Sequence, residues 1–352
     1  MTVDQYLEEG RIEIDKYLEQ YFPHKTGEKY LNALLGEPMY KYDTETFQKA
    51  VTDPLWDLLD RGGKRWRPWM YLTLIKCLDG DVEKYGKMCA VLELIHNGSL
   101  VADDIEDDSK VRRNKPAIHI IYGVDVAVNL SSLMYFLPTK MLDDLDTDAD
   151  TYRRLSAVLH EELIRIHVGQ ATDIGWHKAL KAPDRITVDE YLQMCANKTG
   201  VLPRLACKWA GIVSGLEDDD VDKAGAFGES IGVAFQIQDD MMNLKMAEGL
   251  GKEAAEDITE GKKTLMVIHV FQKADEADKK RLSEILQKHT DKVEDKKEAI
   301  AIMEKYDAFN YAAKTAKDIV LNAWADAEKA LPDNEYKNML HELAIYCVER
   351  KR

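Results

Sequence analysis

Hydrophobic residues recur at helical spacing along most of the chain. Between positions 152 and 166 they stand three or four residues apart, as on one face of an amphipathic helix. The same periodicity marks residues 6–21, 86–105, 118–144, 188–210, 224–244 and most of 272–352, whereas strand-like alternation is confined to 124–128 and 265–270. The pattern predicts an all-α protein, with its helices packed as a bundle.

Local signals set several of the expected helix boundaries. Thr187 followed by Glu190 matches a capping box, which predicts a helix start at Val188. Pro138 is expected to interrupt the helix over 118–144, and residues 218–222 are expected to form an acidic surface turn. Because internal repeats and low-complexity linkers are absent, residues 1–352 are expected to form a single domain. Its charge-rich helices over 272–352 show no sign of chemistry.

The overall charge narrows the range of partners. The 352 residues carry a formal charge of −16, so repulsion disfavours nucleic acid and anionic membrane surfaces as main partners. No apolar run approaches the roughly 18 residues of a membrane span. The five cysteines lack CxxC spacing, and the acidic N-terminus lacks the pattern of a signal peptide. We therefore expect no membrane span and a cytoplasmic location.

Five acidic residues crowd into six positions at the end of the predicted helix 86–105: Asp103, Asp104, Glu106, Asp107 and Asp108. In a helix, Asp103 and Asp107 lie one turn apart on the same face, so their charges repel and a divalent cation would stabilise them. Carboxylates that share the ion with water are typical ligands of Mg²⁺. The alternative interpretation is a solvated acidic helix end.

A second polar group interrupts the apolar segment 224–244, where Gln236, Asp239, Asp240 and Asn243 follow in short order. Buried acids need a charged partner or a metal ion. The presence of two such acidic segments, more than a hundred residues apart, favours a metal-binding function over an incidental charge cluster.

Basic residues accompany the acidic segments. A glycine-led turn at 61–68 carries Lys64, Arg65 and Arg67, whose charges would lie beside the free N–H groups of a helix start and favour an anion. Arg112 and Arg113 follow the first acidic cluster, so that metal and arginine together could hold a diphosphate. The alternative for the turn is a basic loop in solvent. No site is expected in the first 50 residues.

These motifs, in this order, resemble the trans-isoprenyl diphosphate synthases, the polyprenyl synthetase family, over roughly residues 50–270. The resemblance rests on Gly-Lys-Arg-x-Arg-Pro at 63–68, Asp-Asp-Ile-Glu-Asp-Asp at 103–108, Arg-Arg at 112–113, Lys-Thr at 198–199 and Asp-Asp-x-x-Asn at 239–243. Within the family the sequence looks most like geranylgeranyl diphosphate synthases of the eukaryotic type. The resemblance implies a type I isoprenoid synthase fold, a helical bundle around a deep central cavity, and a homodimer.

The resemblance also implies roles for individual residues. Magnesium would be bound by the acids Asp103, Asp104, Asp107, Asp239 and Asp240. The allylic diphosphate would be bound by Arg112, Lys198, Thr199, Gln236, Lys252 and Lys262, and the catalytic residues beside the reacting carbon would be Lys198, Thr199 and Gln236. Isopentenyl diphosphate would be bound by Lys64, Arg67, His96 and Arg113. Gln170 and Asp173 match a family element that lines the cavity.

The implied reaction is a Mg²⁺-dependent head-to-tail condensation of isopentenyl diphosphate with an allylic prenyl diphosphate. The leaving diphosphate gains charge that metal ions and fixed cations offset, and the carbocation needs an apolar cavity without water. In this family a large aromatic residue four or five positions before the first motif limits the product near C15. Gly98 and Ser99 carry no ring, which predicts C20, with C15 and C25 or longer as alternatives. Tyr135 or Phe136 could end the cavity further down.

Asn243 and Met266 depart from the family pattern, replacing an aspartate of the second motif and a common proline. A similar asparagine in eukaryotic-type relatives argues against inactivation. The alternatives are a terpene cyclase or head-to-head synthase on the same fold, and a non-catalytic subunit of a heteromeric synthase. Two separate basic sites argue for two diphosphate substrates, which a cyclase does not need. Both acidic motifs are largely retained, which argues against a subunit without activity.

Overall fold

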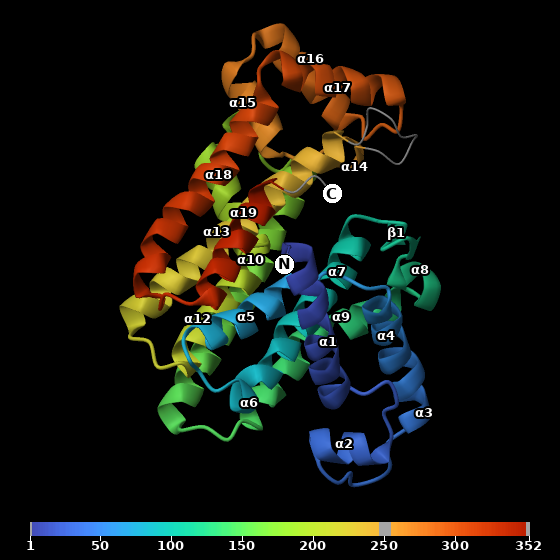
Figure 1. Ribbon diagram of the computed structural model, residues 1–352. Coiled ribbons are helices and arrows are strands. Elements are labelled where there is room, and N and C mark those ends of the chain that lie inside the picture. The colour runs from blue at the N-terminus through green and yellow to red at the C-terminus, as the bar shows by residue number, and fades with distance from the viewer. Residues whose placement is uncertain (1, 246–254, 350–352) are drawn as a thin grey trace. The chain divides into compact units, whose positions relative to one another are not determined.

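The computed structural model describes residues 2–245 and 255–349 and is built almost entirely of helices (Figure 1). Within these ranges the strands are β1 (Val111–Arg112) and β2 (Lys115–Pro116), which pair as a small antiparallel hairpin. The two segments with strand-like alternation, 124–128 and 265–270, are helical instead. The all-α prediction is confirmed.

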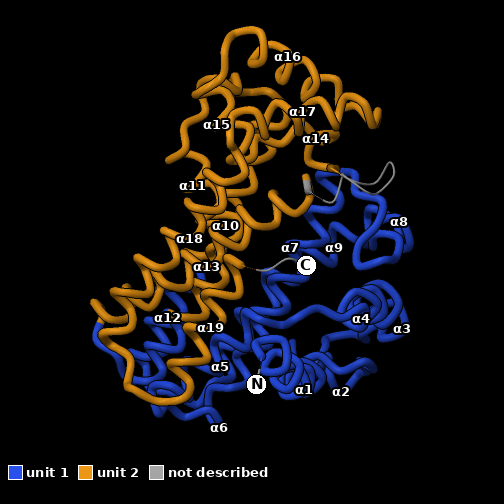
Figure 2. Tube along the Cα trace, turned by 45° about the horizontal axis from the view of Figure 1, so that its top comes forward, with its two compact units in different colours: residues 1–160, 208–217 blue, residues 161–207, 218–352 orange. Residues whose placement is uncertain are grey.

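The chain divides into two compact units (Figure 2). Unit 1 comprises residues 1–160 and 208–217, and unit 2 comprises residues 161–207 and 218–352. The helices α10 (Ala149–His177) and α12 (Val201–Val213) contribute residues to both units. The expectation of a single domain stays a prediction, and each unit is described by itself.

Unit 1 contains the N-terminal helices and the first acidic segment. Its elements are α1 (Val3–Tyr21), α2 (Glu28–Leu35), α3 (Thr44–Phe47), the π-helical turn η1 (Gln48–Thr52), α4 (Asp53–Asp60), α5 (Trp66–Cys77), α6 (Val82–Tyr85), the 3₁₀ turn η2 (Gly86–Met88), α7 (Cys89–Glu106), α8 (Ile118–Tyr122) and α9 (Val124–Asp143).

The core of unit 1 is formed by α5 and α7, which are buried on nearly all sides. Such helices are apolar around their whole circumference because neighbours cover every face. Here α7 packs against α9, α5 and α1. The expected interruption at Pro138 is wrong, because α9 continues through Pro138. The break lies at Gly123, whose φ of 95° ends α8.

Unit 2 contains the second acidic segment. Besides its part of α10, its elements are η3 (Pro183–Arg185), α11 (Val188–Lys198), α13 (Asp218–Lys245), α14 (Glu256–Glu260), α15 (Leu265–Lys273), α16 (Glu276–Gln287), α17 (Val293–Lys305), α18 (Ala308–Ala327), η5 (Glu328–Ala330) and α19 (Glu335–Glu349).

The long helix α13 forms the centre of unit 2 and packs against α18, α11 and α19. The capping box at Thr187 and Glu190 is present as predicted and starts α11. The surface turn expected at 218–222 is wrong, because these residues form the first turn of α13. Acids at a helix N-terminus interact favourably with its partial positive charge, so the cluster stabilises the helix start.

Within the described residues, no helix combines the length and the apolar character that crossing a membrane requires.

Candidate active site

The first acidic motif occupies the last turn of α7, where Asp107 is the C-cap residue. Asp104 is 1% exposed, and burial raises the pKa of its carboxyl while the charge of Arg112 opposes the rise. A helix C-terminus carries partial negative charge, which makes carboxylates at this position unfavourable unless cations offset them. Positive charge near the end of α7 is therefore needed to stabilise these carboxylates.

The β1–β2 hairpin supplies part of that charge. The Nε and Nη2 atoms of Arg112 donate to Oδ1 of Asp104 at 2.8 and 2.5 Å, and Nη2 lies 3.7 Å from Oδ2 of Asp103. Arg113 and Asn114 form the hairpin turn with φ of 52° and 61°, as in the type I′ turns that join two-residue hairpins. Arg113 instead donates to the carbonyl of Leu58 at 3.0 Å. Because of this turn, the two neighbouring arginines point to different partners.

The acids at the end of α7 suit a magnesium ion in their chemistry. The Oδ2 atom of Asp104 is buried and has no hydrogen-bond partner among the described residues. No group of three or more His, Cys, Asp or Glu side chains in the described part of the chain is arranged to hold a metal by itself. Mg²⁺ is commonly bound by one or two carboxylates together with substrate phosphates, so the group Asp103, Asp104 and Asp107 fits an ion that arrives with its substrate.

Arg67, in the first turn of α5, lies beside His96 of α7, with Nη1 of Arg67 3.5 Å from Nε2 of His96. Burial and the charge of Arg67 hold the pKa of His96 well below its usual range, so the ring is neutral. The guanidinium of Arg67 also lies over the ring of Trp66, 4.4 Å from its centroid. Lys64 donates to Asp4 of α1 at 3.3 Å.

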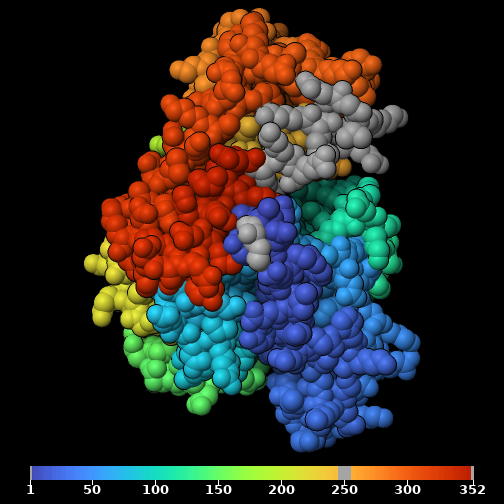
Figure 3. Space-filling model, in the orientation of Figure 1, coloured from blue at the N-terminus to red at the C-terminus, as the bar shows by residue number. Residues whose placement is uncertain are grey.

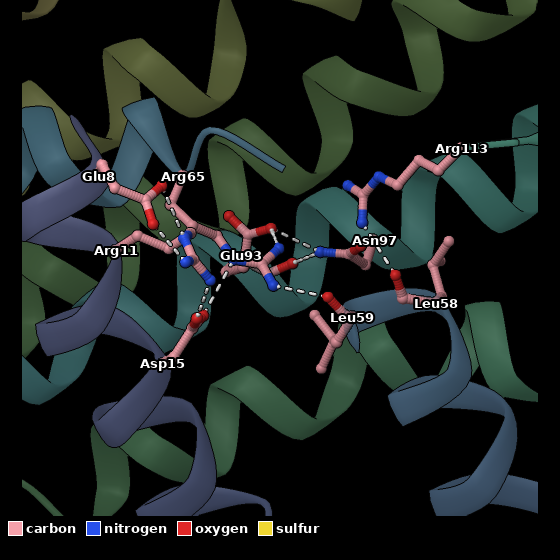
Figure 4. A network of polar contacts seen from close by, with 9 residues as sticks. All are labelled: Glu8, Arg11, Asp15, Leu58, Leu59, Arg65, Glu93, Asn97 and Arg113. Atoms are coloured by element: carbon pink, nitrogen blue, oxygen red, sulfur yellow. Dashed lines mark hydrogen bonds and ion pairs between the residues drawn. The ribbon is translucent and has the colours of Figure 1, made fainter. Parts of the chain in front are cut away.

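Arg113 lies in the same part of unit 1 as this turn (Figure 4). Burial together with the neighbouring charges of Arg65 and Arg112 lowers the pKa of Arg113 to about 10, although Glu93 opposes the shift. Arg67 and Arg113 thus place two cations near the neutral His96 ring, while Lys64 is held to α1 by Asp4.

In unit 2 a chain of hydrogen bonds joins the Lys-Thr motif to the second acidic motif. The hydroxyl of Thr199 donates to Oε1 of Gln236 at 2.7 Å, and Nε2 of Gln236 donates to Oδ1 of Asp240 at 2.7 Å. The Tyr191 hydroxyl donates to the other carboxylate oxygen of Asp240 at 2.7 Å. Lys198 forms an ion pair with Asp173 at 2.5 Å. The sequence predicted these residues at the site, except for Tyr191.

Gly232 explains why Thr199 reaches Gln236. A side chain at position 232 would place its Cβ 2.6 Å from Cα of Gly200 and 2.9 Å from the carbonyl oxygen of Thr199. Only glycine allows α13 to approach the end of α11 so closely. Gln236 lies one turn further along α13, where it meets the Thr199 hydroxyl.

The two acids of the second motif have different surroundings. Asp239 is exposed, whereas Asp240 is 6% exposed and burial raises the pKa of its carboxyl to about 6. Lys262 forms ion pairs with Glu260 at 2.7 Å and with Asp257 at 3.8 Å. Burial, with the nearby carboxyl of Asp240, raises the pKa of Asp257 well above its usual range, although the charge of Lys262 opposes the rise. Lys252, which was also assigned to the allylic diphosphate, lies outside the described residues.

The sequence missed Glu93 and Tyr191, and it grouped Arg65 with the anion-binding cations, whereas Arg65 pairs with Glu93 and Asp15. Glu93 was detectable as a lone acid within the apolar run of α7. Arg65 lay inside a recognised motif, but nothing in the sequence indicated that it turns inward. Tyr191 carries no sequence signal, because a tyrosine at helical spacing is typical of an ordinary core position.

A family model described as polyprenyl synthetase matches residues 48–303. The chain belongs to this family. It is 33% identical over 297 residues to a short chain isoprenyl diphosphate synthase of Methanothermobacter thermautotrophicus, covering 84% of this chain and 88% of that one. It is 32% identical over 310 residues to a geranylgeranyl diphosphate synthase of Saccharolobus solfataricus, covering 86% and 91%.

Solved structures agree with this assignment. The geranylgeranyl pyrophosphate synthetase of Pyrococcus horikoshii superposes with a TM-score of 0.83 at 30% identity, over 99% of this chain and 98% of that one. The resemblance to the polyprenyl synthetases and the isoprenoid synthase fold are both confirmed. The protein is an enzyme, a prenyltransferase of the polyprenyl synthetase family.

The residues assigned to product length in this polyprenyl synthetase, Gly98 and Ser99, lie on α7. A Cβ at Gly98 would lie 2.5 Å from Cβ of Met134, so the glycine also permits the close packing of the two helices. The Ser99 hydroxyl donates to the carbonyl of His96 at 2.8 Å. Tyr135 is half-buried, and its burial, together with the charges of Glu106 and Asp103, raises the pKa of its hydroxyl. Phe136 is 71% exposed. Of the two residues expected to end the cavity, Tyr135 is therefore the better candidate.

Proposed function

We propose that the enzyme condenses isopentenyl diphosphate with an allylic prenyl diphosphate, head to tail and with Mg²⁺, to form C20 geranylgeranyl diphosphate. The observation that carries the proposal is that the neighbouring residues Arg112 and Arg113 contact different partners. Arg112 lies against the acids that suit magnesium, and Arg113 lies with the basic turn near α5. A reaction with two diphosphate substrates needs two such anion sites, whereas a cyclase needs one.

The allylic diphosphate would bind to Arg112, Lys198, Thr199, Gln236, Lys252 and Lys262. When bound, Mg²⁺ held by Asp103, Asp104, Asp107, Asp239 and Asp240 would offset the charge that develops on the leaving diphosphate. The Thr199 hydroxyl and the Gln236 amide would lie beside the allylic carbon. Their dipoles are fixed by hydrogen bonds to one another and to Asp240, so they can stabilise the cation without rearranging.

Isopentenyl diphosphate would bind through Lys64, Arg67, His96 and Arg113. The neutral His96 ring donates or accepts one hydrogen bond without adding charge. As the allylic carbon–oxygen bond breaks, the double bond of isopentenyl diphosphate attacks the cation and forms the new carbon–carbon bond. Loss of one proton to the departing diphosphate completes the product.

The proposed product length rests on Ser99 and on the relatives. Ser99 places no aromatic ring one turn before Asp103. Proteins named geranylgeranyl diphosphate or pyrophosphate synthase recur among the similar chains, including those of Saccharolobus solfataricus and Phomopsis amygdali. A C15 product, or a product of C25 or longer, is the alternative within the same reaction.

We also propose that the enzyme is a homodimer. The α8–α9 stripe, which consists of Ile121, Val124, Val128 and Phe136, has exposed fractions of 45%, 54%, 50% and 71%. Val124, Val128 and Phe136 follow one another at intervals of four and eight residues on α9, and Ile121 precedes them on α8. Although the exposed Ser132 lies between Val128 and Phe136, a group of exposed apolar side chains of this kind is typical of a protein interface.

The test is an incubation with isopentenyl diphosphate, Mg²⁺ and each allylic starter of C5, C10 and C15 in turn, with products identified by mass spectrometry. C20 product that EDTA abolishes is the expected result. Products longer than C20 would retain the reaction and contradict the proposed length. A folded protein that forms no product with any starter would favour the non-catalytic subunit instead.

A further inference from the structure

The helix α1 lies outside the matched family region, which begins at residue 48, yet it contacts the basic turn directly. It packs against α5 and α7, and Asp4 near its start accepts a hydrogen bond from Lys64. A Cβ at Gly10 would lie 2.3 Å from Cδ1 of Trp69, so the α1 backbone is close to α5. Figure 3 shows α1, in blue, at the outer surface of unit 1.

An ionic chain leads from α1 to the buried Glu93 of α7 (Figure 4). Nη1 of Arg11 lies 3.3 Å from Asp15, and Oδ1 of Asp15 lies 3.2 Å from Nε of Arg65. Nη1 of Arg65 then pairs with Oε1 of Glu93 at 2.5 Å. Arg65 and Glu93 are 5% and 2% exposed, so the inner pair is shielded from water.

Arg65 is held in a fixed conformation between Lys64 and Arg67. Its backbone is left-handed, with φ of 51°, which is uncommon for a residue with a side chain. Such a conformation persists where surrounding contacts determine it. The two ion pairs and a hydrogen bond to the carbonyl of Leu59 at 3.0 Å supply those contacts. Lys64 precedes Arg65, and Arg67 follows two positions later.

Glu93 is the buried counter-ion that offsets the repulsion between Arg65 and Arg113. Burial alone would raise the pKa of its carboxyl, but the charges of Arg65 and Arg113 lower that pKa to about 2. Its Oε1 also accepts from Asn97 at 2.7 Å. Without this carboxylate, the guanidinium groups of Arg65 and Arg113 would repel one another before any diphosphate binds.

We propose that Asp15 of α1 is a positioning residue for the isopentenyl diphosphate site, acting through Arg65 and Glu93 on Lys64, Arg67 and Arg113. This inference rests on the substrate assignment proposed above. Asp15 touches no substrate in this arrangement. Its charge and hydrogen bond hold Arg65 so that the flanking cations face one anion. Loss of the Asp15 carboxylate therefore weakens isopentenyl diphosphate binding selectively.

The chain offers a matched control on the same helix. Glu13 pairs with Lys76 of α5 at 3.3 Å, and its side chain is 39% exposed. Asp15 pairs with Arg65 at 3.2 Å, and its side chain is 36% exposed. Asp15→Asn removes a half-exposed charge that pairs with Arg65 and with Arg11 of its own helix, and Glu13→Gln removes a similarly exposed charge that pairs with Lys76. Only the first pair is connected to Glu93.

The experiment measures binding by calorimetry, with isopentenyl diphosphate alone and separately with a non-reactive allylic thiodiphosphate, both with Mg²⁺. Asp15→Asn is expected to raise the Kd for isopentenyl diphosphate about three- to tenfold. The Kd for the allylic analogue and the melting temperature are expected to match those of Glu13→Gln. Asp15→Glu, which keeps the charge, is expected to recover most of the affinity.

Several outcomes would overturn the proposal. Equal Kd values for Asp15→Asn and Glu13→Gln would remove the positioning role, and so would a parallel loss of affinity for both ligands, which would indicate general destabilisation. If the wild-type protein binds isopentenyl diphosphate as described but forms no condensation product, the proposed reaction fails while the positioning role of Asp15 stands. Failure of the wild type to bind isopentenyl diphosphate would overturn both.

Discussion

At the scale of single residues, the acidic motif contains both proposed magnesium ligands and carboxylates that lie at the surface. Asp103 is 23% exposed in its side chain and lies near Arg112, whereas Asp108 is 80% exposed and pairs with Lys110. Asp103→Ala is expected to lower turnover at least about a hundredfold, because one proposed magnesium ligand is removed. Asp108→Ala serves as the control with near-normal turnover. Steady-state assays with circular dichroism check both, and a folded, fully active Asp103→Ala enzyme would contradict the metal assignment.

The lowered pKa of His96 predicts that the stability of the folded protein depends on pH. Its pKa is well below the usual 6.5 in the folded state, so below about pH 6.5 the unfolded chain binds a proton that the folded chain does not. The free energy of unfolding therefore falls as pH decreases. At about pH 5.5 this costs at most about 1.4 kcal/mol. His96→Gln is expected to lose less stability than wild type between about pH 7.5 and pH 5.5, as measured by urea unfolding. An equal loss in both proteins would show that His96 is not the group responsible.

Ser99 allows a test of product length. Ser99→Phe places a ring one turn before Asp103 and is expected to shift the ratio of C15 to C20 product about tenfold or more toward C15. Ser99→Ala, which only removes the hydroxyl, is expected to keep the wild-type distribution. Chromatography of the dephosphorylated products measures the ratio. An unchanged C20 product from an active Ser99→Phe enzyme would contradict the assignment.

At the scale of helices, the α7–α9 contact depends on Gly98. Gly98→Ala is expected to destabilise the protein by about 1–3 kcal/mol, because the new methyl group would lie 2.5 Å from Cβ of Met134 and α9 must shift. Gly175 of α10 provides the control, since a Cβ there would meet only Cδ1 of Leu180 at 3.8 Å. Thermal unfolding measures both variants. If Gly98→Ala is as stable as Gly175→Ala, the close packing imposes no such constraint.

The sequence predicted the presence of helices better than the residues at which they begin and end. The capping box of α11 was correct because its two side chains act within one turn. Pro138 was expected to break its helix, yet the buried face of α9 packs against α7 and stabilises the helix beyond the proline. Gly123 ended α8 instead, through a backbone angle that the sequence does not display. Local rules fail where tertiary packing supplies more stabilisation than the local signal removes.

The motifs of the candidate site could be predicted from the sequence, whereas contacts between residues far apart in the sequence could not. Asp104 and Arg112 are eight residues apart and belong to one recognisable segment. Tyr191 reaches Asp240 from 49 residues away, and Asp15 reaches Arg65 from 50 residues away. Such partners become apparent only when the fold brings distant helices together. The first 50 residues, where no site was expected, accordingly contribute α1 to the surroundings of the basic turn.

At the scale of the whole molecule, the α8–α9 stripe determines the proposed assembly. The double variant Val128→Asp, Phe136→Asp introduces two charges that an apolar interface would have to bury without partners. We expect it to weaken dimerisation by more than about a hundredfold, because central apolar residues carry most of an interface's binding energy. Met39→Asp is the control, since Met39 is 88% exposed but lies outside the stripe.

Light scattering coupled to size-exclusion chromatography measures the mass of each protein over a range of concentrations. A monomeric double variant beside a dimeric wild type and a dimeric Met39→Asp protein would assign the stripe to the dimer interface. Circular dichroism must show an unchanged helix content, so that loss of the dimer is not a consequence of unfolding. A double variant that stays dimeric would place the interface elsewhere, whereas a monomeric wild type would reject the homodimer itself.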